Sequence, residues 1–279
     1  MTAPAKASHP LSLDTLLSPA RTAVMGILNL TPDSFSDGGR FVDPQVAIAH
    51  ATAMVADGAD IIDVGAESTR PYGGMQPVTA EIERARLEPV LPAVVGLGKP
   101  VSVDTLKAPI LDWAIRNGAA IANDVWGLQR DADMARVVAD HGVPVIVMHN
   151  RAEVDPAIDI VDDMLRYFER SLAIADKAGV RREQIVIDPG IGFGKTPEQS
   201  VIAVARLAQL KRFGLPIMIA LSRKRFIASI VPSEPNQRLG GSIAGHLIGV
   251  QEGASIVRTH DVFETVQALR VAEAIGRAR

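Results

Sequence analysis

Eight short runs rich in Val and Ile recur along the chain, and segments with helical patterns separate them. A run dominated by β-branched residues favours a strand, and a segment that starts with a capping residue and stops at Gly favours a helix. Eight alternations of strand and helix predict a (β/α)₈ barrel, with a doubly wound open sheet as the alternative. The predicted strands are residues 23–29, 59–65, 100–104, 120–124, 144–149, 184–190, 216–222 and 254–260.

Length and composition fit one barrel domain. The chain has 279 residues, of which 47% are hydrophobic and 4% are aromatic, so its core must be mainly aliphatic. Such a composition suits a parallel sheet that helices cover. We expect residues 1–20 to be a loosely ordered entry segment and residues 21–279 to form a single domain.

Charge and residue types argue against several classes of function. The formal net charge is −3, so bulk electrostatics does not favour binding to nucleic acid. The absence of Cys excludes a disulfide framework and a thiolate nucleophile, and it fits a reducing, cytoplasmic location. No apolar run approaches the roughly 20 residues that a membrane helix needs. The first ten residues do not resemble a secretion signal.

Polar residues lie at the carboxyl end of nearly every predicted strand. In (β/α)₈ barrels the active site lies at that face. One polar strand end is ordinary, but helix capping hardly explains so many, and we therefore expect a functional pocket there. In chain order the polar groups are Asn29, Glu67 with Arg70, Asp104, Asn123 with Asp124, His149, Asp188, Ser222 with Arg223 and Lys224, and Arg258 with His260.

Three of these groups are suited to bind a flat heteroaromatic ligand. Asp104 and Asp188 are acceptors in largely apolar surroundings, and Asn123 supplies both a donor and an acceptor. A carboxylate can accept two parallel N–H bonds from an amino-pyrimidinone edge. The alternative for Asp104 is an N-cap of the following helix, which its position fits equally well. Pro189 and a glycine run follow Asp188 and make simple capping there less favourable.

Two basic segments lie at the carboxyl ends of the last two predicted strands. "SRKRF" (222–226) places Lys224 where it can form a Schiff base, hold a fixed charge near a ligand, or be solvated. "VRTHD" (257–261) puts Arg258 and His260 on one side of the last strand, with Asp261 as the cap of the next helix. Barrels of this kind often bind phosphate after strands seven and eight, so we favour an anion site over a structural role for His260.

Two loops carry an aromatic residue. "DPGIGFGKT" (188–196) lacks the spacing of a nucleotide-binding loop. We interpret its glycines as letting the backbone pass close to a flat ligand, with Phe193 as a wall and Lys195 in solvent. "NLTPDSFSDGGRF" (29–41) is rich in turn formers, and Phe35 has no obvious core to join. Phe35 can close over a ligand or pack under its own loop.

Eight motifs occur in an order that is more specific than any one of them. They span residues 25–262 and read "MGILNLTPDSFSDGG", "ESTRP", "SVDT", "NDV", "VMH", "DPGIGFGKT", "SRK" and "VRTHDV". This ordered set resembles the dihydropteroate synthase family. The resemblance implies a (β/α)₈ barrel and a transferase of folate biosynthesis that sulfonamides target. Such an enzyme condenses p-aminobenzoate with 6-hydroxymethyl-7,8-dihydropterin diphosphate and releases pyrophosphate, with Mg²⁺ assisting.

The resemblance also implies roles for residues in three groups. The pterin edge would contact Asp104, Asn123 and Asp188, with Met148 and Lys224 beside it. The diphosphate would contact Asn29, Arg258 and His260, with Asn29 also contacting Mg²⁺. The p-aminobenzoate pocket would be lined by Thr69, Pro71, Phe193 and Ser222, with Arg70 available to the anions and Phe35 on the closing loop. The residues implied in catalysis are Asn29, Asp104, Lys224, Arg258 and His260.

Two other functions compete with the synthase. A pterin-binding methyltransferase domain would share the three pterin-edge residues but would need neither the Arg258–His260 pair nor the "STRP" loop, so these features argue against it. A binding-only paralogue would keep the pterin pocket without turnover. For any of the three functions, the apolar helical stretches predict a homodimer.

Overall fold

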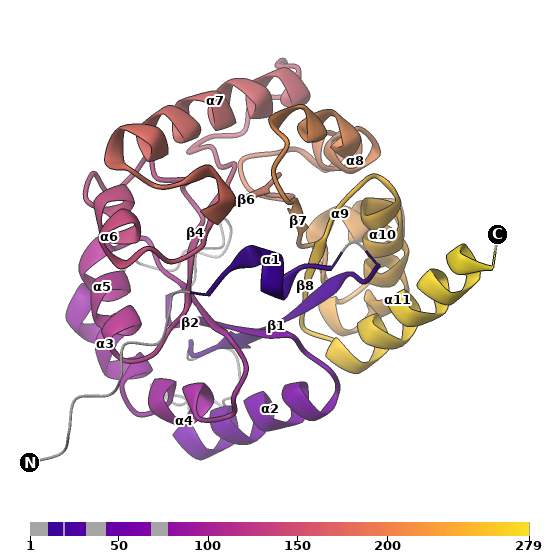
Figure 1. Ribbon diagram of the computed structural model, residues 1–279. Helices are drawn as coiled ribbons and strands as arrows, with labels where there is room; N and C mark the ends of the chain where they lie inside the picture. The colour runs from indigo at the N-terminus through magenta and orange to yellow at the C-terminus, as the bar shows by residue number, and fades with distance from the viewer. Residues whose placement is uncertain (1–10, 19, 32–42, 68–77, 279) are drawn as a thin grey trace, which may run out of the picture.

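The computed structural model describes residues 11–18, 20–31, 43–67 and 78–278, and it forms a ring of strands inside a ring of helices (Figure 1). Every strand pair in the sheet is parallel, in the order β6-β5-β4-β3-β2-β1-β8-β7. A bridge between Ile187 and Ile217 joins β6 to β7, so the predicted (β/α)₈ barrel is confirmed. The strands are β1 (Ala23–Asn29), β2 (Ile61–Gly65), β3 (Val101–Asp104), β4 (Ile121–Asp124), β5 (Val145–Met148), β6 (Ile185–Asp188), β7 (Met218–Ile219) and β8 (Ile256–Thr259).

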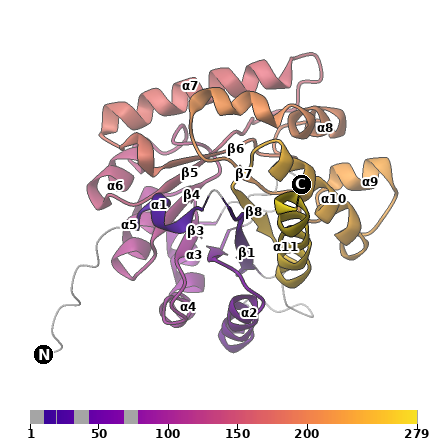
Figure 2. The ribbon, with the colours of Figure 1, turned by 45° about the vertical axis from the view of Figure 1, so that its right-hand side comes forward.

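Helices cover the outside of the barrel (Figures 1 and 2). Within the described ranges, no helix is both long and apolar enough to cross a membrane. The α-helices are α1 (Leu13–Leu16), α2 (Pro44–Ala56), α3 (Ala80–Leu87), α4 (Leu91–Val95), α5 (Ala108–Arg116), α6 (Met134–His141), α7 (Ile160–Ala178), α8 (Pro197–Ala205), α9 (Arg225–Ile230), α10 (Leu239–Gln251) and α11 (Val262–Arg277). Short 3₁₀ helices are η1 (Arg182–Gln184), η2 (Leu207–Phe213) and η3 (Pro235–Gln237).

Local sequence explains where α7 begins and ends and where α8 begins. The side chain of Asp159 caps α7 by accepting from Val161 N at 2.9 Å, and Gly179 ends this helix with φ +86°. Glycine adopts that left-handed conformation without the steric cost that a Cβ brings. At α8, Thr196 and Gln199 form a reciprocal capping box, with Pro197 in the first turn.

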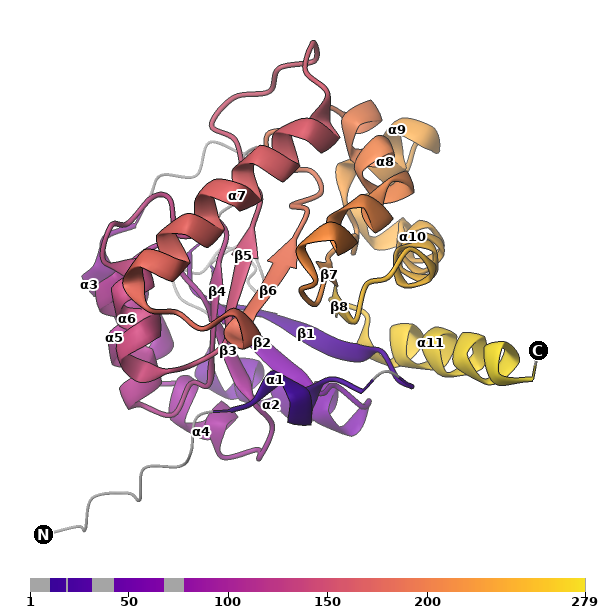
Figure 3. The ribbon, with the colours of Figure 1, turned by 45° about the horizontal axis from the view of Figure 1, so that its top comes forward.

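One apolar layer lies outside the ring of strands, and a second fills its inside. The outer layer packs strand residues against helices, for example through Phe168 of α7, which is fully buried and makes an edge contact with Phe213 at 5.9 Å between ring centroids. The inner layer fills the barrel where the strands begin. There α1 lies over the centre of the ring (Figures 1 and 3). The inner cluster consists of Leu13, Ala23, Met25, Ile61, Ile121, Ile146, Val186, Met218 and Ile256.

The shortest strand departs most from its predicted run. Residues 216–222 were expected to form a strand, but only Met218–Ile219 pairs as β7. Leu221 N donates to His246 Nε2 of α10 at 3.1 Å instead of to a neighbouring strand. Ala220 and Leu221 are still buried, so the apolar run correctly indicated burial while the helix took over the backbone hydrogen bond.

Candidate active site

The sheet register brings the predicted pterin residues to one end of the barrel. Asn29 aligns with Gly65, Gly65 with Asp104, and Asp104 with Asn123 across four adjacent strands. On the neighbouring strands, Met148 aligns with Asp188. These residues therefore lie at the carboxyl ends of β1 and β3–β6, as the sequence predicted for a barrel.

Arg258 on β8 reaches across this end to two buried carboxylates. Its Nε donates to Asp63 Oδ2 at 2.7 Å, and its Nη2 lies 2.6 Å from the same oxygen and 3.3 Å from Asp104 Oδ2. Asn123 Nδ2 donates to both oxygens of Asp63 at 3.2 Å. Burial disfavours the guanidinium charge, but the neighbouring Asp63 and Asp104 outweigh it and raise the pKa of Arg258.

Asp63 was not singled out from the sequence. It lies within β2, has no exposed surface and connects Arg258 to Asn123. The available signal was the carboxylate between Ile62 and Val64 in the run "ADIIDVG", because a charge placed in a core strand must find a partner.

Asp104 does not cap a helix. Helix α5 begins at Ala108 with Lys107 at the N-cap position, so the capping alternative for Asp104 is wrong. Burial and the nearby charge of Asp63 raise the pKa of Asp104 to about 8, although Arg258 opposes the shift. Its Oδ1 is buried and has no hydrogen-bond partner among the described residues. A buried acceptor of this kind points to a ligand that donates to it.

Asp188 at the end of β6 is only 1% exposed. Its Oδ1 accepts from Gly190 N at 2.7 Å, so it orders the start of the following loop without capping a helix. Burial raises its pKa, and the positive charges of Lys224, Arg258 and Lys195 counteract the shift. The carboxylate thus lies among cations at the edge of the same site.

Lys224 lies over an aromatic ring. Its Nζ is 4.3 Å from the ring centroid of Phe193, and the residue occupies the N-cap position of α9. A cation at this distance from an aromatic face is attracted to it. The contact supports the interpretation of a fixed charge over that of a solvated basic turn, and it brings the loops after β6 and β7 together.

Ser222, His260 and Asp261 form a separate group after β7 and β8. Ser222 Oγ accepts from His260 N at 3.1 Å and lies 2.9 Å from His260 Nδ1. Asp261 was expected to cap α11, but its carboxylate makes no cap hydrogen bond and instead pairs with Arg223, whose Nε donates at 3.1 Å. Of the two predicted anion ligands, Arg258 contacts Asp63 and His260 contacts Ser222, so each is held by a different neighbour.

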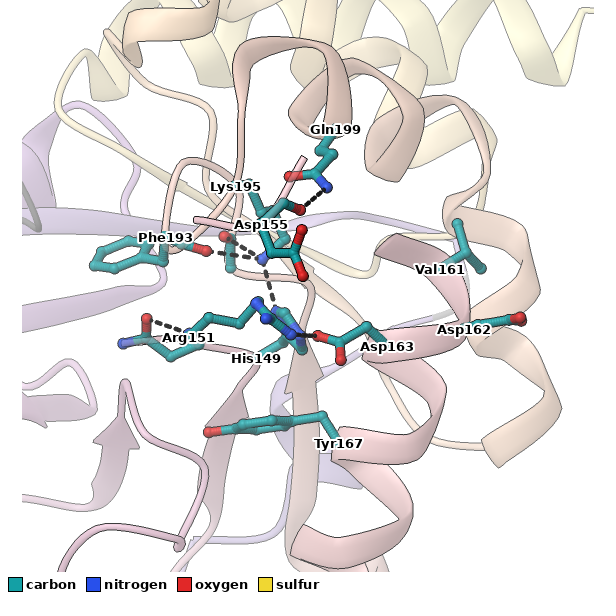
Figure 4. Close-up of polar contacts among 12 residues, drawn as sticks. His149, Arg151, Asp155, Val161, Asp162, Asp163, Tyr167, Phe193, Lys195 and Gln199 are labelled. Atoms are coloured by element: carbon teal, nitrogen blue, oxygen red, sulfur yellow. Dashed lines mark hydrogen bonds and ion pairs between the residues drawn. The ribbon is translucent and has the colours of Figure 1, made fainter. Parts of the chain in front are cut away.

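Lys195 was expected in solvent, and this expectation is wrong. The residue is 2% exposed, and its Nζ lies 2.7 Å from His149 Nδ1 (Figure 4). Burial lowers its pKa to about 7. A sequence pattern of glycines does not reveal which way the one long side chain among them points, so the sequence could not decide between solvent and core.

Four predicted residues, Phe35, Thr69, Arg70 and Pro71, lie outside the described residues. The residues on either side of the range 68–77, Glu67 and Val78, are joined by a hydrogen bond. Glu67 Oε1 accepts from Val78 N at 3.2 Å, and Glu67 Oε2 pairs with Lys107 Nζ at 2.5 Å. Lys107 also pairs with the buried Glu83 at 2.7 Å.

A surface groove lies at the other end of the barrel. It has a volume of about 570 Å³ and lies beside α1, where the strands begin. The unpaired carboxylate oxygen and the buried ion pairs described above are at the opposite face, so we assign the candidate site there. The groove is lined by Leu13, Asp14, Leu17, Ser18, Arg182, Glu183, Gly214, Leu215, Pro216 and Ser255.

Known proteins resemble this chain in sequence and in fold. Residues 25–260 match the model of a family described as pterin binding enzyme. A dihydropteroate synthase of Bacillus subtilis is 44% identical over 91% of this chain and 89% of its own. The structure superposes on the dihydropteroate synthase of Clostridium difficile, solved in the presence of pteroic acid, with a TM-score of 0.88, 45% identity and coverage of 92% of this chain and 97% of that one.

A second solved structure contains a different small molecule. The dihydropteroate synthase of Xanthomonas albilineans, solved with 4-aminobenzoic acid, gives a TM-score of 0.87 at 41% identity and covers 92% of this chain and 93% of its own. Family match, sequence identity and fold agree along nearly the whole chain. The chain therefore belongs to the dihydropteroate synthases, transferases of the pterin-binding enzyme family.

Proposed function

We propose that this chain condenses p-aminobenzoate with 6-hydroxymethyl-7,8-dihydropterin diphosphate at the carboxyl end of its barrel, giving 7,8-dihydropteroate and pyrophosphate in folate biosynthesis. The observation that carries the proposal is Asp104, a buried carboxylate whose Oδ1 lacks a donor among the described residues. A pterin edge offers the N–H groups that such an acceptor needs.

The pterin would bind between Asp104, Asn123 and Asp188, with Met148 and Lys224 beside it. Asn123 is already oriented by Asp63, and Asp188 by Gly190 N, so little reorganisation is needed when the ring enters. Rigid strand ends that hold donors and acceptors in place reduce the entropy lost on binding. Lys224 supplies a positive charge next to the ring, and its contact with Phe193 fixes that charge in space.

The diphosphate would lie toward Arg258, His260 and Asn29. Arg258 already contacts Asp63 and Asp104 through Nε and Nη2, and Nη1 is the nitrogen that would donate to an anion. His260 is oriented by Ser222, which would also line the arylamine pocket together with Phe193. Thr69, Pro71, Arg70 and Phe35 enter the proposal only through their motifs in the sequence.

The residues present fit a Mg²⁺ ion that binds together with the diphosphate. Within the described ranges, no group of three or more His, Asp or Glu side chains could hold a metal ion. Mg²⁺ usually keeps several waters and takes one or two protein oxygens together with substrate phosphates, and the amide oxygen of Asn29 offers such a ligand. When bound, the ion would stabilise negative charge on the departing diphosphate.

The reaction needs no nucleophilic side chain. The C–O bond to diphosphate breaks as the electron-rich dihydropterin stabilises a cationic methylene group, and the arylamine nitrogen then attacks that carbon and loses a proton. Asp104, Asn123 and Asp188 orient the ring, while Arg258 and His260 would hold the leaving group. The contribution of the protein is therefore positioning and charge stabilisation.

A steady-state assay of pyrophosphate release tests this function against a binding-only paralogue. Release that requires both substrates supports the synthase, and pterin binding without release supports the paralogue. The homodimer and the cytoplasmic location stay predictions from the sequence.

A further inference from the structure

A buried polar chain lies beside the candidate site and is not part of it. His149 follows β5, has no exposed surface, and contacts Lys195 Nζ through Nδ1 at 2.7 Å and Asp163 Oδ2 through Nε2 at 3.0 Å. Asp163, in the first turn of α7, also pairs with Arg151 Nη1 at 2.9 Å. Figure 4 shows His149 between Lys195, which comes from the loop after β6, and Asp163 of α7.

The direction of each hydrogen bond in this chain follows from charge. Burial first, and the charge of Lys195 second, lower the pKa of His149 to about 3, so the imidazole is neutral near neutral pH and carries one N–H. The His149 hydrogen bond and Arg151 lower the pKa of Asp163 despite its partial burial, so this carboxylate can only accept. His149 Nε2 therefore donates to Asp163, and Nδ1 accepts from Lys195.

Lys195 also binds the backbone of its own loop. Its Nζ donates to Gly190 O at 2.8 Å and to Phe193 O at 3.2 Å. Together with His149 Nδ1, these carbonyls give three acceptors for the three N–H groups of an ammonium. The charged groups that act on Lys195 are Asp188, Lys224, Asp163 and Arg151.

The loop that Lys195 holds is rich in glycine, and its own backbone adds one hydrogen bond, from Phe193 N to Gly190 O at 3.0 Å. Gly190, Gly192 and Gly194 all have positive φ, and a Cβ on Gly190 would lie 1.9 Å from His149 O. Glycine allows this close approach, but it also gives the loop the largest conformational entropy to lose. Asp188 accepts from Gly190 N while Lys195 donates to Gly190 O, so both polar groups of this residue are held.

The same loop presents Phe193 to Lys224. Lys195 fixes the carbonyl of Phe193, and the Phe193 ring then lies 4.3 Å from Lys224 Nζ. A second link ties this region to the loop after β5, because Gln199 Nε2 donates to Asp155 O at 2.7 Å (Figure 4). Loss of the Lys195 contacts would thus loosen the aromatic wall, which would keep only the Phe193 N–Gly190 O hydrogen bond and the contact with Lys224. The strand ends that carry Asp104 and Asn123 would stay in place.

We propose that Lys195 is a positioning residue which, through His149 and Asp163, fixes Phe193 as the wall of the arylamine pocket. The inference rests on the proposed function, since it takes p-aminobenzoate as the ligand of that pocket. Lys195 itself lies under the loop and acts through Phe193.

Hydrogen exchange of the peptide that covers residues 189–196 tests the tether without any turnover. The Lys195→Met variant removes all three donors and keeps most of the side-chain volume, so we expect faster exchange of this peptide than in the wild type. The matched control is Lys177→Met, which changes an exposed lysine of α7 and should leave exchange unchanged. Unchanged exchange in Lys195→Met, with an active wild type, overturns the positioning role and leaves the proposed function intact.

Kinetics and binding then separate positioning from general damage. Lys195→Met should raise the KM for p-aminobenzoate about tenfold or more, since the hydrogen bonds to Gly190 O and Phe193 O that hold the loop are lost. The Kd for a pterin without phosphate should change less than about threefold, because its acceptors lie on rigid strand ends. Equal losses for the two ligands indicate a merely structural role and overturn the proposal.

Two further variants make the test decisive. In a Phe193→Ala background, Lys195→Met should raise the KM for p-aminobenzoate little further, and fully additive effects would contradict action through Phe193.

If Lys195→Met does not fold, the test uses Asp163→Ala, which changes the residue at the far end of the Lys195–His149–Asp163 hydrogen-bond chain. It should shift the same KM in the same direction by a smaller factor, and a wild-type KM overturns the proposal. A wild type that releases no pyrophosphate contradicts the proposed function instead.

Discussion

Replacement of Asp63 by Asn should disturb both the stability of the barrel and its ligand site. Asp63 is fully buried and accepts from Arg258 Nε at 2.7 Å and from Asn123 Nδ2 at 3.2 Å. Asn keeps the size and one acceptor oxygen but removes the charge that balances Arg258. The same change removes the negative charge that helps to raise the pKa of Asp104.

The expected magnitude follows from the two opposing effects. Removing one partner of a buried ion pair costs about 3–5 kcal/mol, because the remaining charge stays buried and uncompensated. Arg258 can still pair with Asp104, and the repulsion between Asp63 and Asp104 disappears. We therefore expect Asp63→Asn to lower the free energy of unfolding by about 2–3 kcal/mol, and to lower the pKa of Asp104.

Urea denaturation measures the stability, and calorimetry measures pterin affinity as a function of pH. The matched control is Asp176→Asn, which removes an exposed carboxylate of α7 and should change stability by less than about 0.5 kcal/mol. The pH profile of pterin affinity in Asp63→Asn should shift toward lower pH, because Asp104 ionises more easily. A variant as stable as the control, with the wild-type affinity and pH profile, would refute this account of Asp63.

Three further changes address the site, the buried chain and the close packing of its loop. Asp188→Asn and Lys224→Ala should each weaken pterin binding, by about 2–5 kcal/mol for the buried Asp188 and by less for the half-buried Lys224. Calorimetric affinities equal to wild type would exclude the assignment. His149, with its pKa lowered to about 3 by burial and by Lys195, takes up its proton in the unfolded state near pH 6.5 but in the folded state only near pH 3. The free energy of unfolding should thus fall as pH falls through this window, by up to about 5 kcal/mol. In His149→Gln, denaturation curves should show a weaker dependence of this free energy on pH. An unchanged dependence would show that other groups cause it. Gly190→Ala should destabilise the protein by more than about 3 kcal/mol in thermal or urea unfolding, because its Cβ would lie 1.9 Å from His149 O. The control Gly179→Ala, at φ +86° with open space around the new Cβ, should cost only about 1–2 kcal/mol. Similar costs for the two variants would argue against the close approach at Gly190.

The barrel was predictable because its signal is repeated along the whole chain. Each strand is a short apolar run, and glycines such as Gly142, which ends α6 with φ +67°, separate helices from the strands that follow. The rule that carboxyl ends of barrel strands meet at one face then placed Asn29, Asp104, Asn123 and Asp188 together without further information. Periodicity and topology were sufficient for these residues.

The remaining features depend on side-chain direction, which a single sequence does not encode. Asp63 lies in the middle of a strand, and only the fold shows that Arg258 reaches it from β8. Lys195 follows a glycine run, and the burial of its ammonium depends on His149, which lies 46 residues earlier. Asp261 follows a strand as a cap would, but Arg223 competes for its carboxylate.

Pyrophosphate release on mixing the two substrates with Mg²⁺ tests the central claim most directly. The synthase account predicts release only when both p-aminobenzoate and 6-hydroxymethyl-7,8-dihydropterin diphosphate are present, with one 7,8-dihydropteroate formed for each pyrophosphate, and a loss of most of this activity in Asp188→Asn. A chain that binds the pterin but releases no more pyrophosphate with both substrates than with the pterin diphosphate alone would contradict it.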